Sequence, residues 1–267
     1  MGSTISVIMA CHNRRDSTIK CLRALHLAVE TASITIFLVD DGSTDGTVEA
    51  VNVEFPAINI ISGDGSLYWA ASMAIAERDA MRIHPDYLLW LNDDTILDAG
   101  AVDRMLAISQ IHPGAIIAGV TRDPLTGRVT YGGRMRIDRH PQRFFLLPAS
   151  ASVVPIDGFN GNCVLIPKSA RLAVGPIDGQ FPHAFADDDY GQRAARLGIS
   201  LLQAPDTIGI CCNNHVGSAP KGVLNRWRYF ESPKRLPWRA QWRYMRRHGD
   251  RTWPFWFVAS TAKRFLA

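Results

Sequence analysis

A continuous apolar run, residues 87–91 (Tyr-Leu-Leu-Trp-Leu), ends directly on segment 92–94 (Asn-Asp-Asp). Such a run is typical of a strand that is buried on both faces. Two neighbouring carboxylates resist ionising together unless a cation lies between them. Ligands bind at the carboxyl ends of strands in open α/β sheets, and oxygen-rich acidic sites there suit a hard divalent ion. The alternative is a helix N-terminus, capped by Asp94 or Thr95.

Strands and helices are predicted to alternate through the first half of the chain. Apolar runs predict strands over residues 5–10, 34–39, 58–61, 87–91 and 116–120. The segments between them predict helices over residues 17–30, 46–53, 72–81 and 101–110. This rhythm predicts an α/β fold with a mostly parallel central sheet and helices on both faces.

The regular alternation ends after residue 120. Residues 121–155 are rich in Gly, Pro and Arg, which predicts loops and short antiparallel strands. We also expect a strand over 163–166, a helix over 188–197 and a strand over 199–202. A small antiparallel part should therefore accompany the parallel sheet.

The C-terminal segment 219–267 differs from the rest of the chain in charge. Twelve Lys and Arg residues face only Glu231 and Asp250, so this segment carries about +10 and residues 1–218 about −6. Its tryptophans are Trp227, Trp238, Trp242, Trp253 and Trp256. We predict a catalytic-type domain over 1–218 and a basic, Trp-rich helical extension over 219–267.

The extension suits an anionic membrane surface, because Trp and Arg both find partners in a lipid headgroup layer. Nucleic acid is the competing partner, but the acidic body would repel a long polyanion, so we predict no nucleic-acid binding. The alternative is an appendage that packs its tryptophans on the domain and leaves its arginines in solvent. Nothing in the sequence predicts the oligomeric state.

Three features bear on location. No stretch reaches the roughly 18 apolar residues of a spanning helix. The chain enters a predicted strand at Ile5, which predicts no signal peptide. Its cysteines are odd in number and lack a C-x-x-C pair, which is typical of reduced thiols in the cytosol. We expect a cytoplasmic protein, peripheral on the inner face of the cell membrane.

Two glycine-containing turns follow the second and third predicted strands. Asp41, in segment 39–46 (Val-Asp-Asp-Gly-Ser-Thr-Asp-Gly), should point into the crevice and accept from a ribose hydroxyl or a base N–H. Its alternative role is turn and cap chemistry. Segment 63–69 (Gly-Asp-Gly-Ser-Leu-Tyr-Trp) would let a phosphate approach the backbone. No G-x-G-x-x-G follows the first strand, which argues against a nicotinamide or flavin fold.

A second acidic cluster, Asp187 to Asp189, begins the helix predicted near residue 188. Acids there interact favourably with the helix dipole. Beside a cation, one of them would have the tuned pKa of a general base. The distal His215 is more often structural, but near a divalent ion it becomes a plausible nitrogen ligand.

Taken together, these motifs resemble the inverting GT-A glycosyltransferases of family 2, over about residues 5–218. The segments that carry the resemblance are, in chain order, Ile5–Ala10 with Asn13, Val39–Thr47, Asn92–Asp94, Gly158–Pro167, Asp187–Tyr190 with Arg193, and His215 with Ser218. Segment 63–69 is nearer to variants that act on rhamnose or galactofuranose-type donors.

The resemblance implies a role for each matching residue. Asp187 would be the catalytic base, and Asp94 with His215 would hold Mg²⁺ or Mn²⁺. The implied nucleotide-sugar-binding residues are Ala10, His12, Asn13, Asp41, Gly65, Ser66, Trp69, Asn92, Asp93, Asn160 and Gly161.

The chain departs from the family pattern at three points. Asn92 begins the D-x-D motif, so the ion would depend on Asp94. His12 replaces the frequent aromatic after the first strand. Ala186 replaces the first acid of the E-D-x-D motif, so the base is Asp187 or, with a shift of one residue, Asp188.

The resemblance implies an inverting, metal-assisted transfer of a sugar from a nucleoside-diphosphate sugar to a hydroxyl of a glycan or lipid-linked acceptor. Inversion needs one base and no carboxylate nucleophile. The alternative is a non-catalytic nucleotide-sugar-binding or membrane-associated module of the same fold. A nucleotidyltransferase would need a Gly-rich basic loop after the first strand, which this chain lacks.

Overall fold

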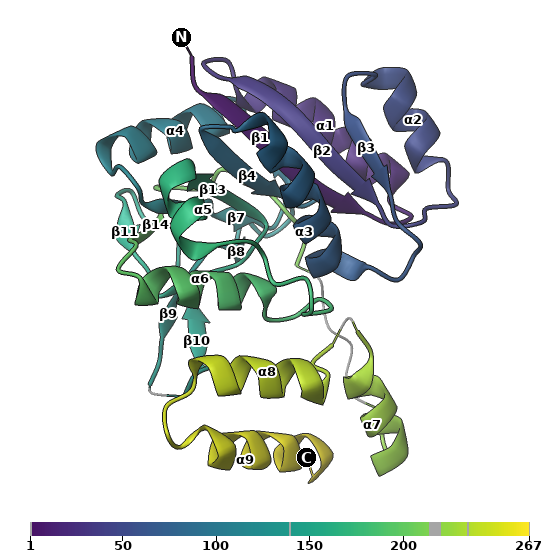
Figure 1. Cartoon of the computed structure of the whole chain (residues 1–267), viewed down its shortest axis with the longest axis vertical. Coiled ribbons are helices and arrows are strands. Elements are labelled where there is room, and N and C mark those ends of the chain that lie inside the picture. The colour runs from purple at the N-terminus through teal and green to yellow at the C-terminus, as the bar shows by residue number, and fades with distance from the viewer. Residues whose placement is uncertain (1, 139, 214–219, 234, 267) are drawn as a thin grey trace.

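The computed structural model describes residues 2–138, 140–213, 220–233 and 235–266. Within them, eight strands form the central sheet, in the spatial order β11-β14-β6-β13-β4-β1-β2-β3 (Figure 1). Their bounds are β1 (Thr4–Cys11), β2 (Ser33–Asp40), β3 (Asn59–Ser62), β4 (Tyr87–Leu91), β6 (Ile116–Ala118), β11 (Val154–Pro155), β13 (Cys163–Pro167) and β14 (Leu201–Gln203). Strands β4, β1, β2 and β3 run parallel, whereas β13 pairs antiparallel with both β4 and β6.

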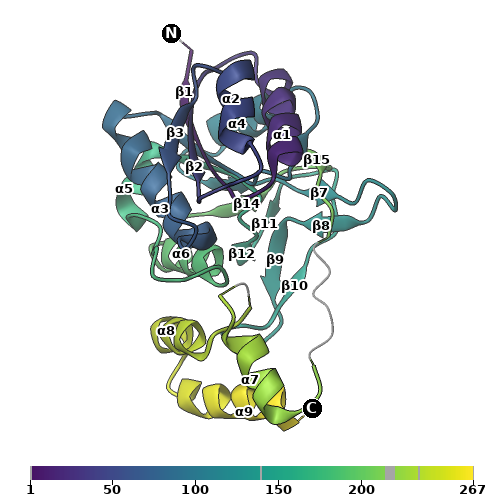
Figure 2. The same ribbon diagram turned by 90° about the vertical axis from the view of Figure 1, so that its right-hand side faces the viewer.

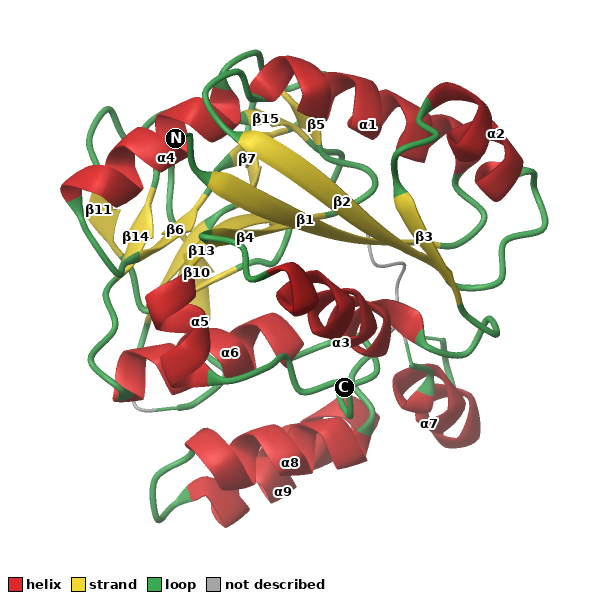
Figure 3. Ribbon diagram, turned by 45° about the horizontal axis from the view of Figure 1, so that its top comes forward, coloured by secondary structure: helices red, strands yellow, loops and turns green. Residues whose placement is uncertain are grey.

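Helices cover both faces of this sheet, which confirms the predicted α/β fold (Figure 3). Their bounds are α1 (Arg15–Ala28), α2 (Thr47–Glu54), α3 (Tyr68–Ala80), the 3₁₀ helix η1 (Met81–Ile83), α4 (Ala101–Ile111), α5 (Lys168–Val174) and α6 (Ala186–Arg196). Helices α1, α2 and α4 lie on one face, and α3, α5 and α6 lie on the other.

Short strands form two smaller sheets. One contains β9 (Gly133–Arg136), β10 (Phe144–Leu146) and β12 (Gly158–Phe159). The other contains β5 (Ile96–Leu97), β7 (Thr121–Arg122), β8 (Val129–Tyr131) and β15 (Gly209–Ile210). Because segment 92–95 leads into β5, the helix-cap alternative for Asp94 and Thr95 is wrong.

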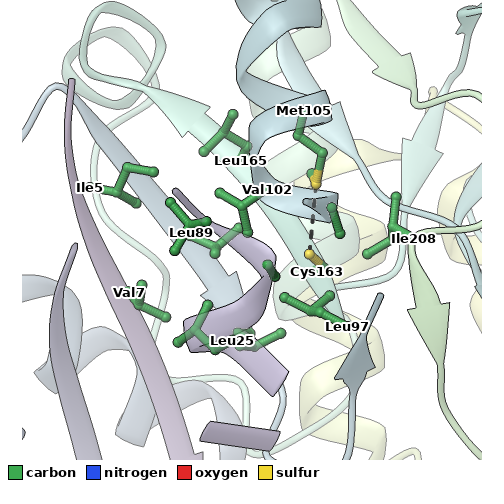
Figure 4. Packing of buried hydrophobic residues seen from close by; sticks show 14 of the residues in the cluster. Ile5, Val7, Leu25, Leu89, Leu97, Val102, Met105, Cys163, Leu165 and Ile208 are labelled. Atoms are coloured by element: carbon green, nitrogen blue, oxygen red, sulfur yellow. Dashed lines mark hydrogen bonds between the residues drawn. The ribbon is translucent and has the colours of Figure 1, made fainter. Parts of the chain in front are cut away.

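Strand β4 is buried on both faces, as its continuous apolar sequence predicts. Leu89 packs in the core beneath α1 and α4, where the Cys163 thiol lies 3.8 Å from the Met105 sulfur (Figure 4). On the opposite face, Trp90 is fully buried and meets Tyr190 edge to face, with 4.9 Å between ring centroids.

Three further helices follow the domain: α7 (Val223–Glu231), α8 (Trp238–His248) and α9 (Trp253–Leu266). They lie together beyond α6 and the β9–β10 hairpin (Figures 1 and 2). None of the helices in the described ranges combines the length and the apolar composition needed to cross a bilayer. The division of the chain at residue 218 stays a prediction.

Helix α8 packs directly on the body of the molecule. Its Tyr244 is fully buried, stacks on Phe185 with 4.9 Å between centroids, and donates to the Pro141 carbonyl at 3.0 Å. The outward-facing Trp238 and Trp242 remain 36% and 40% exposed. The extension therefore packs through α8 but leaves Trp238 and Trp242, as well as Trp227 at 45% exposure, partly open to solvent.

A buried ionic junction joins α8 to α6. The Asp189 carboxylate is fully buried and accepts from Arg193 at 2.9 Å, Arg247 at 2.7 Å and His248 at 2.8 Å. Removing one partner of such a buried network leaves the others unsatisfied and is strongly destabilising. The C-terminal helices thus hold the helix that bears the second acidic cluster.

We expect Trp90→Ala to lower the free energy of unfolding by about 3–5 kcal/mol, because the change opens a large cavity in a closed core. Leu125→Ala is the control, since that side chain is 94% exposed and surface changes stay within about 0.5 kcal/mol. Urea unfolding measures both values. Equal effects of the two substitutions would contradict the assignment of Trp90 to the core.

Acid should weaken the α6–α8 junction through His248. Burial lowers the pKa of His248, although the bond to Asp189 opposes the shift. The unfolded chain therefore binds this proton more readily, so stability decreases as pH falls below about 6.5. We expect wild type to lose more unfolding free energy than His248→Gln between about pH 7.5 and pH 5.5 in denaturant titrations. The same loss in both proteins would refute this role.

Candidate active site

The predicted site residues that the structure describes gather at one rim of the sheet. The carboxyl ends of the parallel strands β1, β2 and β4 open there, and the first turns of α3 and α6 face the same rim. This is where ligands bind in open α/β sheets.

Four predicted residues from four segments form one connected group. The Trp69 indole N–H donates to the Asn92 side-chain oxygen at 2.8 Å. The Gly161 amide donates to the Asp187 carboxylate at 3.0 Å. A Cβ on Gly161 would lie 2.8 Å from the Trp69 ring and 3.4 Å from the Asp187 Cβ. Only glycine fits between these two side chains, so the group is closely packed.

A cation from the segment that joins β1 to α1 contacts both acids that follow β4. One Nη atom of Arg14 lies 3.0 Å from Asp93 and 2.7 Å from Asp94. Burial raises the pKa of Asp93 to about 7, Arg14 opposes the shift and Asp94 adds to it. Sequence reasoning expected a cation between these acids but missed Arg14. Its signal was a basic residue three positions after the end of the parallel strand β1.

The Asp41 carboxylate is 5% exposed and organises the loop that precedes α3. It accepts from the backbone amides of Gly65 at 2.8 Å, Leu67 at 3.3 Å and Tyr68 at 2.9 Å. A Cβ on Gly63 would lie 2.7 Å from an Asp41 oxygen, so this loop requires glycine there. The structure therefore shows turn-holding by Asp41, and its direct contact with a ligand stays a prediction.

His12 and Asn13 connect the end of β1 to the turn after β2. The His12 ring lies 2.5 Å from the Asp41 carbonyl oxygen. The backbone N–H of Asn13 donates to the Ser43 hydroxyl at 2.8 Å, and the side-chain oxygen of Asn13 accepts from the backbone N–H of Thr44 at 2.7 Å. Both predicted residues thus lie at the same rim as Asp41.

The remaining predicted donor-site residues lie nearby but make mainly local contacts. Ala10 is partly exposed near the end of β1. Ser66 donates twice to the exposed Asp64, at 2.9 and 2.7 Å. Asn160 precedes Gly161, and its amide donates to the Gly132 carbonyl at 3.0 Å.

The three acids of α6 have different environments. Asp189 is buried in the junction with α8, as described above. Asp188 pairs with Arg134 of β9, which sequence reasoning also missed. Burial raises the pKa of Asp188 to about 6, and Arg134 opposes the shift. Asp187 is partly exposed and contacts the Gly161 amide.

Backbone strain gathers around this site. Asn13, Tyr68 and Phe185 are non-glycine residues with positive φ angles of 51°, 55° and 74°. Each such residue costs on the order of 1–3 kcal/mol and persists only where surrounding contacts hold it. Tyr244 of α8 stacks on Phe185, immediately before the acids of α6. The C-terminal helix therefore supports the strained start of that helix.

The acid pair offers oxygen ligands of the kind that Mg²⁺ and Mn²⁺ prefer. One oxygen of Asp93 is buried without a hydrogen-bond partner, which fits a site that can accept a cation. No group of three or more His, Cys, Asp or Glu side chains converges for a metal within the described ranges. The predicted ligand His215, with Ser218, lies outside them.

Sequence comparison gives the family. Residues 6–167, more than half of the chain, match the family model of Glycosyl transferase family 2. Proteins from two Mycobacterium tuberculosis strains are 25% identical to this chain over 231 residues, covering 77% of this chain and 75% of each relative. Both are described as N-acetylglucosaminyl-diphospho-decaprenol L-rhamnosyltransferases.

Solved structures share the fold at low sequence identity. GalNAc-T7 with UDP, GalNAc and Mn²⁺ has a TM-score of 0.62 at 11% identity, covering 99% of this chain and 58% of that chain. The Pyrobaculum calidifontis mannosyltransferase PcManGT with GDP-Man and Mn²⁺ has a TM-score of 0.58 at 16% identity. The match covers 100% of this chain and 71% of that chain. S. aureus TarS 1–349 has a TM-score of 0.56 at 14% identity. The match covers 78% of this chain and 60% of that chain.

These likenesses show the fold alone, and the chain spans about 60% of the length of GalNAc-T7 and TarS 1–349. The family match rests on the sequence and includes the strands that bear the acid pair and the Asp41 turn. The chain therefore belongs to glycosyl transferase family 2 and is a glycosyltransferase.

Proposed function

We propose that the chain transfers a sugar, with inversion, from a nucleoside-diphosphate sugar to a hydroxyl of a lipid-linked acceptor. The observation that carries this proposal is the connected group of Trp69, Asn92, Gly161 and Asp187 beside the acid pair. It brings a partly exposed carboxylate to the rim where the diphosphate of a donor would lie.

The donor nucleotide would lie across the ends of β1 and β2. Asp41 holds the amides of Gly65 and Tyr68 in place, and His12 and Asn13 hold the facing turn. A site whose supporting side chains are already bonded is preorganised for its ligand. Trp69 and Asn92, together with Asn160 and Gly161, would contact the sugar end.

Asp187 is the proposed general base. Asp189 is unsuited because three cationic or potentially cationic side chains surround it in a closed junction. Asp188 is paired with Arg134, which competes for its oxygens. Within the described residues, Asp187 forms no ion pair with Arg134 or with the side chains around Asp189. It belongs to the connected group with Trp69, Asn92 and Gly161. As the acceptor oxygen attacks the anomeric carbon, Asp187 takes its proton, and the bond to the diphosphate oxygen breaks.

Asp94, with Asp93 and His215, would hold Mg²⁺ or Mn²⁺. Such an ion, when bound, supplies positive charge to the departing diphosphate. The buried, unpartnered oxygen of Asp93 supports this assignment. Arg14 bonds both acids in the structure, so its guanidinium would have to yield these oxygens to the ion.

The donor and acceptor classes are proposed from the curated relatives. Those proteins are described as L-rhamnosyltransferases that act on a diphospho-decaprenol-linked sugar. A deoxyhexose donor and a polyprenyl-diphosphate-linked acceptor are therefore proposed for this chain. Such an acceptor is held at a membrane, which agrees with a cytoplasmic enzyme that lies on an anionic surface through residues 219–267.

Asp187→Asn should lower turnover by about 10²–10⁴ and leave donor binding nearly intact, because the amide cannot accept the proton. Activity assays on membrane extracts with nucleoside-diphosphate sugars give turnover, and calorimetry gives donor affinity. Asp16→Asn is the matched control, since that carboxylate is 77% exposed on α1. Undiminished turnover in Asp187→Asn would rule out this residue as the base and direct attention to Asp188.

Asp94→Ala should remove most of the affinity for nucleoside diphosphates that depends on the metal. Losing one carboxylate deprives a hard cation of an oxygen ligand that it needs. Calorimetric titration of UDP, GDP and dTDP, each with and without Mn²⁺, measures the difference, and Asp16→Ala serves as control. If Mn²⁺ raises affinity as much in Asp94→Ala as in wild type, Asp94 is not a ligand.

A further inference from the structure

The outer face of α8 lines a groove of about 800 Å³ that the proposed chemistry does not use. Its lining residues are Trp238, Arg239, Trp242, Arg243, Arg246 and Arg247. These residues recur at intervals of three and four, so they share one face of the helix. Opposite them, Ala240, Tyr244 and Met245 are buried against the body. We call this surface the α8 groove.

The α8 groove has positive charge that the surrounding residues do not neutralise. Arg243 and Arg247 both reach Asp178, at 3.3 and 2.8 Å. Arg239 and Arg246 are exposed, and neither forms an ion pair with an acid in the described part of the chain. Guanidinium groups bind phosphate oxygens in pairs of parallel hydrogen bonds. The groove therefore suits a phosphate-bearing ligand.

Apolar surface adjoins these cations. Trp238 and Trp242 are partly exposed within the groove itself. Trp242 also contacts Trp253 and Phe257 of α9, with 4.7 and 5.2 Å between ring centroids. A ligand that combines phosphate with an apolar chain would satisfy both parts of this surface.

One loop connects the groove to the candidate active site. Asp178 of this loop binds the groove arginines, as described above. Next to it, a Cβ on Gly179 would lie 3.2 Å from Ala74 of α3. Farther along, the Pro182 carbonyl accepts from the Ala70 amide at 3.5 Å, immediately after Trp69. The loop is thus packed between α8 and the part of α3 that bears Trp69.

A second connection runs through the base helix. Arg247 lines the groove and also bonds Asp189, which is two residues beyond Asp187. Two residues of a helix that are two positions apart lie about 3 Å apart along the axis but about 200° apart around it, so Asp189 and Asp187 leave α6 on opposite sides. A phosphate in the groove would lie close to the helix that presents the proposed base, on the side opposite Asp187.

We propose that the α8 groove binds the diphosphate of a polyprenyl-diphosphate-linked acceptor, so that the attached sugar extends along the loop at residues 178–182 toward the part of α3 that bears Trp69. This inference rests on the proposed function and specifies how its acceptor is recognised. Charge complementarity selects the diphosphate, and the exposed aromatic rings accommodate the first part of the apolar chain.

Binding of farnesyl diphosphate to the full-length chain tests the proposal. Calorimetry is done below the aggregation concentration of the lipid and in EDTA, which suppresses metal-dependent binding at the donor site. We expect wild type to bind farnesyl diphosphate, and farnesol to bind far more weakly. The double variant Arg239→Gln/Arg246→Gln should bind about tenfold more weakly, because two charge-assisted contacts are lost.

Arg128→Gln is the matched control, since this exposed arginine lies on the β7–β8 connection and lines no part of the groove. Its affinity should equal that of wild type. Circular dichroism and thermal unfolding verify that the double variant remains folded, which is expected because both substituted side chains are exposed. Unchanged affinity in a folded double variant would overturn the proposal.

Co-sedimentation with vesicles separates acceptor recognition from general membrane attachment. The vesicles contain phosphatidylcholine alone or phosphatidylcholine with phosphatidylglycerol. If the double variant no longer binds vesicles that contain phosphatidylglycerol but binds farnesyl diphosphate as wild type does, the groove is a membrane contact and the proposal fails.

The affinity of the wild-type chain for the donor is measured in parallel, in the presence of Mn²⁺. If wild type binds the donor but does not bind farnesyl diphosphate, this inference alone is refuted. If wild type does not bind the donor, the proposed function is refuted.

Discussion

The structure depends on balancing charge at the end of a buried strand. Because β4 is apolar and covered on both faces, its continuation places Asp93 in a nearly closed environment beside Asp94. Arg14 stands three residues after the end of the neighbouring strand β1, and parallel pairing of β1 with β4 brings the guanidinium to both acids. The sheet pairing therefore creates the charge balance on which the rim of the site depends.

The same pairing of acids with cations from distant segments gives the three adjacent acids of α6 three different environments. Asp189 faces α8 and is bound by cationic or potentially cationic groups from two helices. Asp188 faces β9 and pairs with Arg134. Asp187 faces Gly161 and the site. Residues after 218 thus contact the helix that bears the second acidic cluster, so a chain truncated at that point would lose contacts around Asp189.

Much of the fold was predictable because its signals are local. The run over 87–91 is the observed β4 to the residue, and the acids at 187–189 begin a helix as expected. The structure also brings Trp69, Asn92, Gly161 and Asp187 together, whereas their roles in binding and catalysis stay predictions. The helix-cap alternative after β4 failed because a turn-forming acidic segment leads equally well into a short strand.

The sequence by itself determined the alternation of strands and helices, the positions of the acids and the family. Apolar periodicity and strand-end polarity are properties of consecutive residues, so they can be read without the fold. Tertiary structure decided which cation meets which acid. Arg14, Arg134 and Arg247 are separated from their carboxylate partners by more than fifty residues. Such pairs depend on the register and stacking of distant elements, for which a single sequence carries no local signal.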